Sequence, residues 1–197
     1  MLLSLFIATA AHAAPDLTVS GGLRTTLSTF NQSAWENTGT GTGGQLGVQI
    51  GDRVGTEWFA DYITSDLEGP ARRVDDHIGW SLLFYPIATD GYQKPVLPYV
   101  LAGHCFDYTR ISVVDGRKER AEDRWSSAIQ FGAGTRFNLT ERLDLSPTAQ
   151  YMMHLGNDLH YEPHGHGKVG SSHHGSIEGH LLFNLSVNYR FMMPKSA

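Results

Sequence analysis

The 197-residue sequence has a single cysteine and no apolar run long enough to cross a bilayer as a helix. One thiol excludes an internal disulfide, and we expect Cys105 to act as a small buried side chain. A membrane helix needs about 20 apolar residues. Any crossing of a membrane must therefore use a closed β-barrel, because only helices and closed barrels satisfy every backbone polar group in lipid.

Basic residues are also few, with 15 Lys and Arg against 20 Asp and Glu and a net charge of −5. They are scattered along the chain, so we expect no nucleic acid as a partner, since that interaction needs clustered cations. Glycine is abundant, at 22 residues, alongside 8 prolines and 11% aromatic residues. This composition favours many short strands and turns.

The N-terminus has the pattern of a secretory signal peptide. Residues 2–11 form a short uncharged apolar run, and Ala11-His12-Ala13 is a small-x-small site of the kind that signal peptidase cuts. We therefore expect residues 1–13 to be a signal peptide and residues 14–197 to form one exported β-barrel domain.

The segment at 180–191 alternates between apolar and polar residues. Successive side chains of a strand point to opposite faces, so one face is apolar and the other carries amides and an arginine. The apolar face consists of Leu181, Phe183, Leu185, Val187, Tyr189 and Phe191. The polar face consists of His180, Asn184, Ser186, Asn188 and Arg190, with Leu182 as the apolar exception. Such a strand suits a wall between lipid and a polar lumen.

Similar alternation predicts eight strands in all. Their ranges are 17–30, 44–50, 56–64, 77–85, 99–109, 125–139, 143–154 and 180–191. Long loops are expected at 31–43, 65–76, 110–124 and 155–179, and shorter connections at 51–55, 86–98 and 138–142. The strand at 99–109 is ambiguous in register. Keeping its histidine out of lipid places Ala102, His104, Phe106 and Tyr108 inward.

An even number of antiparallel strands with alternately short and long connections is typical of outer-membrane barrels. We therefore predict an all-β fold, an eight-stranded antiparallel up-and-down transmembrane β-barrel with short periplasmic turns and long extracellular loops. A soluble lipocalin-like barrel or sandwich is the alternative, and it would turn the apolar face inward. Aromatic residues near the strand ends favour the membrane barrel, namely Trp35, Trp58, Trp80, Tyr85, Tyr99, Trp125, Tyr151 and Tyr189.

Two segments carry a resemblance to a known family. The run Phe131-Gly132-Ala133-Gly134-Thr135-Arg136-Phe137 and the strand at 143–151 resemble the small eight-stranded outer-membrane barrels of the OmpA and OmpX type. The last strand resembles their C-terminal assembly signal, which would be carried by Leu185, Val187, Tyr189 and Phe191. The resemblance implies a monomer in the bacterial outer membrane, with membrane lipid, lipopolysaccharide and the outer-membrane assembly machinery as its partners.

Several charged residues fall on the inward faces of the predicted strands. Unpaired burial of charge is costly, and eight strands enclose an interior that side chains can fill. We therefore predict a plug of ion pairs and amides, with an ion path as the alternative. The predicted network consists of Arg24, Glu57, Asp61, Arg136, Gln150 and Arg190.

Seven of the ten histidines lie between residues 154 and 180. Neutral imidazole binds Zn, Ni and Cu, so this loop could capture a metal. The candidate ligands are His160, His164, His166, His173 and His174. The alternative is a solvated polar loop without a cofactor, because no carboxylate or cysteine pattern there fixes a geometry.

An enzymatic alternative is a lipid A deacylase, because those hydrolases are also eight-stranded outer-membrane barrels. Their His-x-Ser-Asn motif corresponds here to His154-Leu155-Gly156-Asn157, with Gly156 in place of the serine. Without a hydroxyl there is no nucleophile for the histidine to activate. We therefore expect a non-enzymatic barrel that serves envelope integrity, surface interaction or narrow solute passage.

Overall fold

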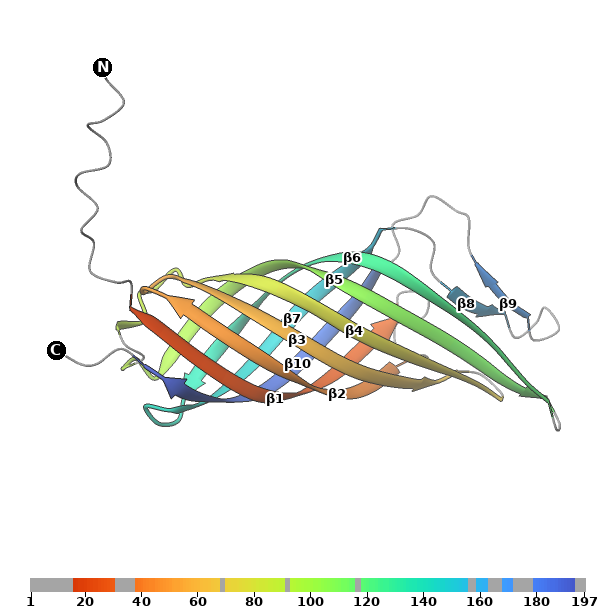
Figure 1. The fold of residues 1–197 in the computed structure, drawn as a ribbon, viewed down its shortest axis with the longest axis horizontal. Coiled ribbons are helices and arrows are strands. Elements are labelled where there is room, and N and C mark those ends of the chain that lie inside the picture. Colours follow the sequence, from red (N-terminus) through yellow and green to blue (C-terminus); the bar gives the residue numbers. More distant parts are fainter. Residues whose placement is uncertain are drawn as a thin grey trace, which may run out of the picture.

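Eight antiparallel strands close into a barrel in the computed structural model (Figure 1). The order around the barrel is β1-β10-β7-β6-β5-β4-β3-β2, so consecutive barrel strands are neighbours and β10 closes onto β1. The structure describes residues 16–30, 38–67, 70–90, 93–115, 118–155, 159–162, 168–171 and 179–193. The predicted fold class is confirmed.

The barrel strands are β1 (Leu17–Phe30), β2 (Thr38–Ile50), β3 (Val54–Asp66), β4 (Ala71–Phe84), β5 (Val96–Asp115), β6 (Lys118–Asn138), β7 (Leu143–His154) and β10 (Gly179–Met192). Two further strands, β8 (Leu159–Glu162) and β9 (Lys168–Ser171), pair only with each other. They lie in a segment that was predicted to be loop throughout. Within the described residues, no helix is long and apolar enough to span a membrane.

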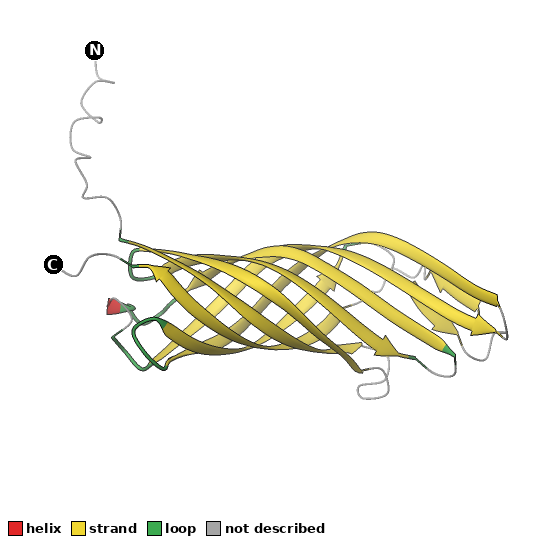
Figure 2. Cartoon of the chain, turned by 60° about the horizontal axis from the view of Figure 1, so that its bottom comes forward, coloured by secondary structure: helices red, strands yellow, loops and turns green. Residues whose placement is uncertain are grey.

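The two ends of the barrel differ in their connections (Figure 2). The short-turn end carries both described chain ends and the turns at 51–53, 85–95 and 139–142. The first of these turns needs a left-handed residue, and Gly51 supplies it with a φ of 61°. The opposite end carries the connections that follow β1, β3, β5 and β7. We call it the long-loop end.

β5 and β6 form the longest hairpin, with 20 and 21 residues, and reach beyond the other strands (Figure 1). Their pairing runs from Val96↔Phe137 to Asp115↔Lys118. The loop predicted at 110–124 is therefore mostly wrong. The loops predicted at 31–43 and 65–76 are also too long, because β2 begins at Thr38, β3 ends at Asp66 and β4 begins at Ala71. Charge misled the prediction, because charged side chains are solvated beyond the bilayer and do not prevent backbone pairing there.

The two faces of the barrel wall have opposite chemistry. Large apolar side chains cover the outer face, where Leu23 is 77% exposed, whereas inward polar side chains are buried, with Arg190 at 1%. A soluble barrel would bury its apolar face instead. The arrangement therefore excludes the lipocalin-like alternative and confirms the face that was predicted for the last strand.

The predicted register of β5 is wrong. Asp107 is 0% exposed whereas Phe106 is 56% exposed, so the odd-numbered residues of this part of the strand face inward. His104 lies on the outer face, where its Nε2 is 2.6 Å from Oγ of Ser127 and its ring packs edge-on against Phe106. A neighbouring hydroxyl thus accommodates the imidazole there, and burial of the Asp107 carboxylate decides the register. The residues wrongly placed inward are Ala102, His104, Phe106 and Tyr108.

Two apolar clusters interrupt the polar interior. The mid-barrel cluster consists of Phe59, Ile63, Cys105, Ala128, Met152 and Leu182. The short-turn cluster consists of Leu83, Tyr85, Leu97, Tyr99 and Leu101, so Tyr85 and Tyr99 lie in the interior and not on the outer wall that the strand-end aromatics were expected to line. Leu182, the apolar exception in the polar face of the last strand, therefore meets apolar side chains from other strands, such as Phe59. Cys105 is buried among them, as expected.

Candidate functional site in the barrel interior

An ion-pair group joins β1 to β3 inside the barrel. Nε of Arg24 lies 3.1 Å from Oδ1 of Asp61, and its Nη1 lies 3.5 Å from Oε1 of Glu57. The guanidinium also lies over the ring of Phe59, 4.6 Å from its centroid. Gly43 leaves room for this group, because a Cβ at that position would lie 2.1 Å from Oδ1 of Asp61. The structure thus brings three of the predicted network residues together.

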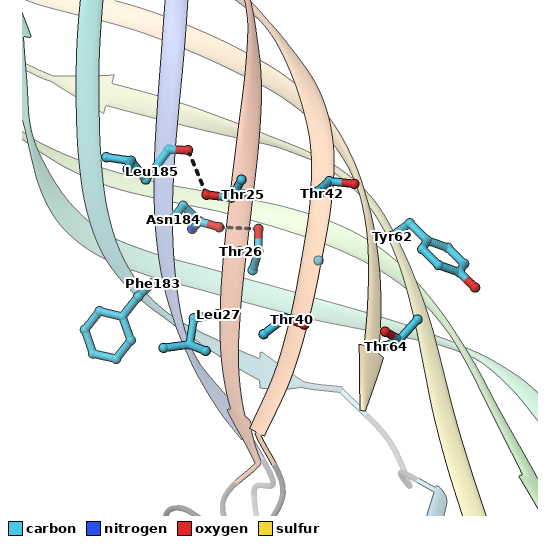
Figure 3. Close-up of a pocket in the computed structure, with 11 residues that line it drawn as sticks. Thr25, Thr26, Leu27, Thr40, Thr42, Tyr62, Thr64, Phe183, Asn184 and Leu185 are labelled. Atoms are coloured by element: carbon cyan, nitrogen blue, oxygen red, sulfur yellow. Dashed lines mark hydrogen bonds between the residues drawn. The ribbon is translucent and has the colours of Figure 1, made fainter. Parts of the chain in front are cut away.

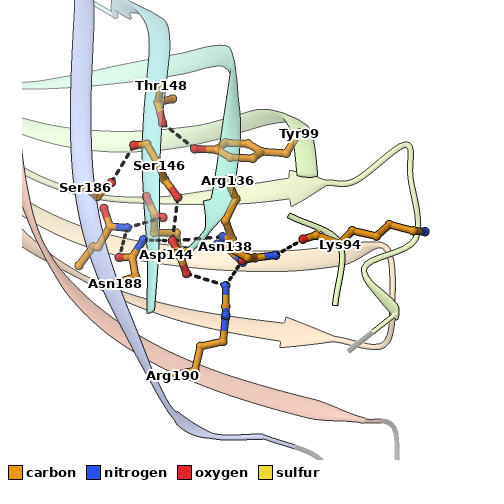
Figure 4. Close-up of polar contacts among 12 residues, drawn as sticks. Lys94, Tyr99, Arg136, Asn138, Asp144, Ser146, Thr148, Ser186, Asn188 and Arg190 are labelled. Carbon is orange, nitrogen blue, oxygen red and sulfur yellow. Dashed lines mark hydrogen bonds and ion pairs between the residues drawn. The ribbon is translucent and has the colours of Figure 1, made fainter. Parts of the chain in front are cut away.

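A second group surrounds Asp144 on β7 (Figure 4). Nη2 of Arg190 donates to its Oδ2 at 2.8 Å, and Nε of Arg136 lies 3.6 Å from its Oδ1. Asn188 and Ser146 donate to the same Oδ1 at 2.8 and 2.9 Å. Alternation in the strand at 143–154 places Asp144 on the inward polar face, although it was not named among the network residues, and the structure makes it the centre of this group.

The Arg190 guanidinium also anchors the short-turn end. Nη1 donates to the backbone oxygen of Glu141 at 2.9 Å, and Nη2 donates to the side-chain oxygen of Asn138. Asn138 in turn donates to the backbone oxygen of Lys94 at 2.6 Å (Figure 4). One buried cation therefore connects the last barrel strand to two of the three turns.

Amide side chains join the two ion-pair groups. Nε2 of Gln45 lies 3.0 Å from Oε2 of Glu57 and 2.7 Å from Oδ1 of Asn188, which itself donates to Asp144. Gln150 belongs to a separate amide contact, in which its Nε2 donates to Oε1 of Gln130 at 3.4 Å. Five of the six predicted residues are therefore members of one connected network, and the hydrogen bond between Gln150 and Gln130 does not join it.

A third polar group lies toward the long-loop end, and the sequence prediction missed it. Asp107 stands between two imidazoles, with His77 Nε2 3.4 Å from one carboxylate oxygen and His154 Nδ1 3.4 Å from the other. The ring of His180 lies 4.6 Å from that of His154. Asp75 lies in the same group. The sequence prediction placed Asp107 on the outer face because it assigned β5 the wrong register. It left out Asp75 because β4 was expected to begin only at residue 77.

The predicted metal loop lies largely outside the described residues. His164, His166, His173 and His174 fall there, and the side chain of His160 on β8 is also not described. The metal capture predicted for this loop stays a prediction. The first residue of the deacylase-like motif is described, and His154 is buried inside the barrel, away from the outer wall.

The predicted assembly signal lies on the outer face of β10. Leu185, Val187, Tyr189 and Phe191 are all exposed there, on the strand that pairs with both β1 and β7. Side chains on this face do not depend on the lumen for packing, so they could be recognised before the barrel closes. Its role in assembly stays a prediction.

A groove of about 620 Å³ crosses the outer wall over β10, β1, β2 and β3 (Figure 3). Threonines line much of it, including Thr25, Thr40 and Thr42. Oγ1 of Thr25 donates to the backbone oxygen of Leu185 at 3.4 Å. Backbone carbonyls of a neighbouring strand thus provide a partner for a hydroxyl on the outer face.

Comparison with known proteins agrees with this architecture. The family model described as the outer membrane protein beta-barrel domain matches residues 1–191, and the chain belongs to this family. The short-turn end is therefore periplasmic and the long-loop end extracellular. The outer membrane is the location of the protein.

Solved structures of similar fold include a major outer membrane protein from Thermus thermophilus, with 15% identity, 91% of this chain and 100% of that chain covered and a TM-score of 0.58. Neisserial surface protein A has 17% identity and a TM-score of 0.55, and the match covers 89% of this chain and 97% of that chain. The N-terminal barrel domain of Pseudomonas aeruginosa OprF has 14% identity and a TM-score of 0.51, and the match covers 87% of this chain and 97% of that chain. These identities show the fold alone. No curated protein matches the sequence.

Proposed function

We propose that this protein is a plugged, non-enzymatic outer-membrane barrel that stabilises the envelope. The observation that carries the proposal is the connected network between Arg24 and Arg190, which crosses the interior between strands far apart in the sequence. The mid-barrel and short-turn clusters add apolar side chains to the same interior. Eight strands enclose just enough space for such side chains, so narrow solute passage is the less favoured function.

The burial of His154 supports a non-enzymatic role. Acyl chains of membrane lipid contact the outer wall of a barrel, whereas this imidazole lies inside beside Asp107. Among the described residues Ser126 offers a hydroxyl to this imidazole, and its Oγ lies 3.3 Å from the same Nδ1 that faces Asp107. A relay needs opposite nitrogens of the imidazole, one for the nucleophile and one for the carboxylate.

The proposed partners follow from the outer face and from the last strand. Membrane lipid and lipopolysaccharide would cover the apolar wall, and the assembly machinery would receive β10 through its outward apolar residues. Residues 1–13, which lie outside the described part of the chain, would direct export. Once inserted, the barrel would act as a monomer.

Conductance tests the plug. Purified protein reconstituted in planar bilayers should give no steady single-channel current, and liposomes that contain it should not swell in small sugars. A 16-stranded porin reconstituted in the same way is the positive control, because barrels of that size leave an aqueous channel. A steady, large conductance from the wild-type protein would overturn the proposal in favour of solute passage.

A further inference from the structure

Histidine and aspartate side chains gather inside the barrel just beyond the mid-barrel cluster. The group consists of Asp75, His77, Asp107, His154 and His180, all buried. Asp107, for example, lies two residues closer to the extracellular end than Cys105 of that cluster. The group therefore rests on an apolar floor and lies in the extracellular half of the lumen.

The distance between the His77 imidazole and the Asp107 carboxylate is long for a hydrogen bond. Nε2 of His77 and Oδ1 of Asp107 are 3.4 Å apart, longer than an ordinary N–H···O hydrogen bond of about 2.7–3.2 Å. Among the described residues neither atom has a hydrogen-bond partner, although the two residues are only 1% and 0% exposed. Buried polar atoms are rarely left in this state. The pair thus has unused capacity to bind a ligand.

The same spacing fits a metal ion. Ligand atoms about 2.0–2.1 Å from a tetrahedral zinc ion lie about 3.3–3.4 Å from one another. One ligand atom from each of Asp75, His77 and Asp107 lies within 4.8 Å of the others. We propose that these three residues form a binding site for a divalent transition-metal ion such as zinc.

The surroundings of the two carboxylates support the site. Nε of Arg73 lies 3.0 Å from both oxygens of Asp75, and Thr109 donates to its Oδ1 at 2.7 Å. His154 faces the second oxygen of Asp107 at 3.4 Å. Carboxylate ligands of metals are commonly held by hydrogen-bonding neighbours of this kind. Each proposed carboxylate ligand thus has a positioning residue.

The charge balance also favours a cation. Asp75 and Asp107 carry two negative charges, and Arg73 offsets one of them. Asp61 stands opposite His77 in the pairing of β3 with β4, but its carboxylate is paired with Arg24. The remaining charge of −1 attracts a cation, and a divalent ion would leave the group with a net charge of +1. One imidazole and two carboxylates form a mixed nitrogen and oxygen set that suits zinc and its neighbours in the first transition series.

Zinc calorimetry on the full-length refolded barrel tests the proposal. The histidines of the predicted metal loop must first be removed as competitors, by changing His160, His164, His166, His173 and His174 to Asn. This parent protein should bind one zinc ion per barrel. His77→Gln or Asp107→Asn should weaken binding at least about tenfold. His104→Gln is the matched control, because it changes a histidine on the outer face of β5 and should leave affinity unchanged.

Folding of each variant is checked by its gel migration without heating. Folded His77→Gln and Asp107→Asn proteins that bind zinc as tightly as the parent would overturn the site, as would a parent that binds none. Should both variants fail to fold, X-ray absorption of the zinc-loaded parent decides. A shell of nitrogen and oxygen ligands with imidazole scattering supports the site, and a shell without imidazole contradicts it.

Discussion

Asp144 contacts four polar side chains in the interior near the periplasmic end. It faces two arginines, Arg190 and Arg136, and accepts hydrogen bonds from an amide and a hydroxyl. Both Asp144 and Arg190 are almost fully shielded from solvent. Removal of one member of such a pair leaves the other charge buried without compensation.

Asp144→Ala should therefore destabilise the barrel by about 3–5 kcal/mol if the site is dry, and by less where water enters. Urea unfolding of the refolded protein, followed by tryptophan fluorescence, measures this change. Glu141→Ala is the control, because that side chain is exposed in a turn and its backbone oxygen still accepts from Arg190. A change of about 0.5 kcal/mol or less is expected there. Equal effects of the two substitutions would show that the network contributes nothing specific.

Leu185 tests the outer face at the middle of β10. Leu185→Arg places a cation in lipid and should cost about 2–4 kcal/mol of folding free energy near the bilayer centre. Refolding into vesicles over a series of denaturant concentrations measures it. Leu139→Arg, at an exposed leucine of a periplasmic turn, should be nearly neutral. If the two leucines tolerate arginine equally, the face of β10 does not meet lipid.

At the scale of single elements, β5 provides the sharpest test, because its register differs from the sequence prediction. Cys105 is buried in the mid-barrel cluster, so the folded barrel should resist alkylation of this thiol, and urea should expose it. Labelling with a lipid-soluble maleimide followed by mass spectrometry checks this. A Cys105→Ala, His104→Cys protein should be labelled while folded. Labelling of native Cys105 with protection of the cysteine at 104 would restore the predicted register.

A comparison of β1, β5 and β7 shows what the sequence could and could not predict. The bounds of β1 and β7 agree with the predicted 17–30 and 143–154, because their alternation is regular and both ends have clear turn residues. The predicted face of β5 was wrong because Cys105, His104 and Tyr108 are compatible with either face of a barrel strand. The group around Asp107 was missed because β5 was given the wrong face and β4 a late start, and because its members meet only through the relative stagger of β4, β5, β7 and β10.

At the scale of the whole molecule, every barrel strand is paired on both sides. Such a barrel has no open edge from which it could unravel. We therefore expect heat-modifiable migration, in which the unheated protein runs at a different position from the boiled protein in SDS gels. The boiled sample is the internal control. Identical migration of both samples would mean that no detergent-resistant barrel forms.

The pairing of β1 with β10 has a further consequence for how the chain must fold. Thr26 donates to Asn184 across 158 positions of sequence, so this contact joins the beginning of the barrel to its end. Contacts of such high sequence separation make folding slow, because loop-closure entropy must be overcome before the contact forms. The barrel cannot close until its last strand has been synthesised and translocated. We therefore expect the chain to remain unfolded until β10 is available, with its apolar wall residues open to aggregation during that interval.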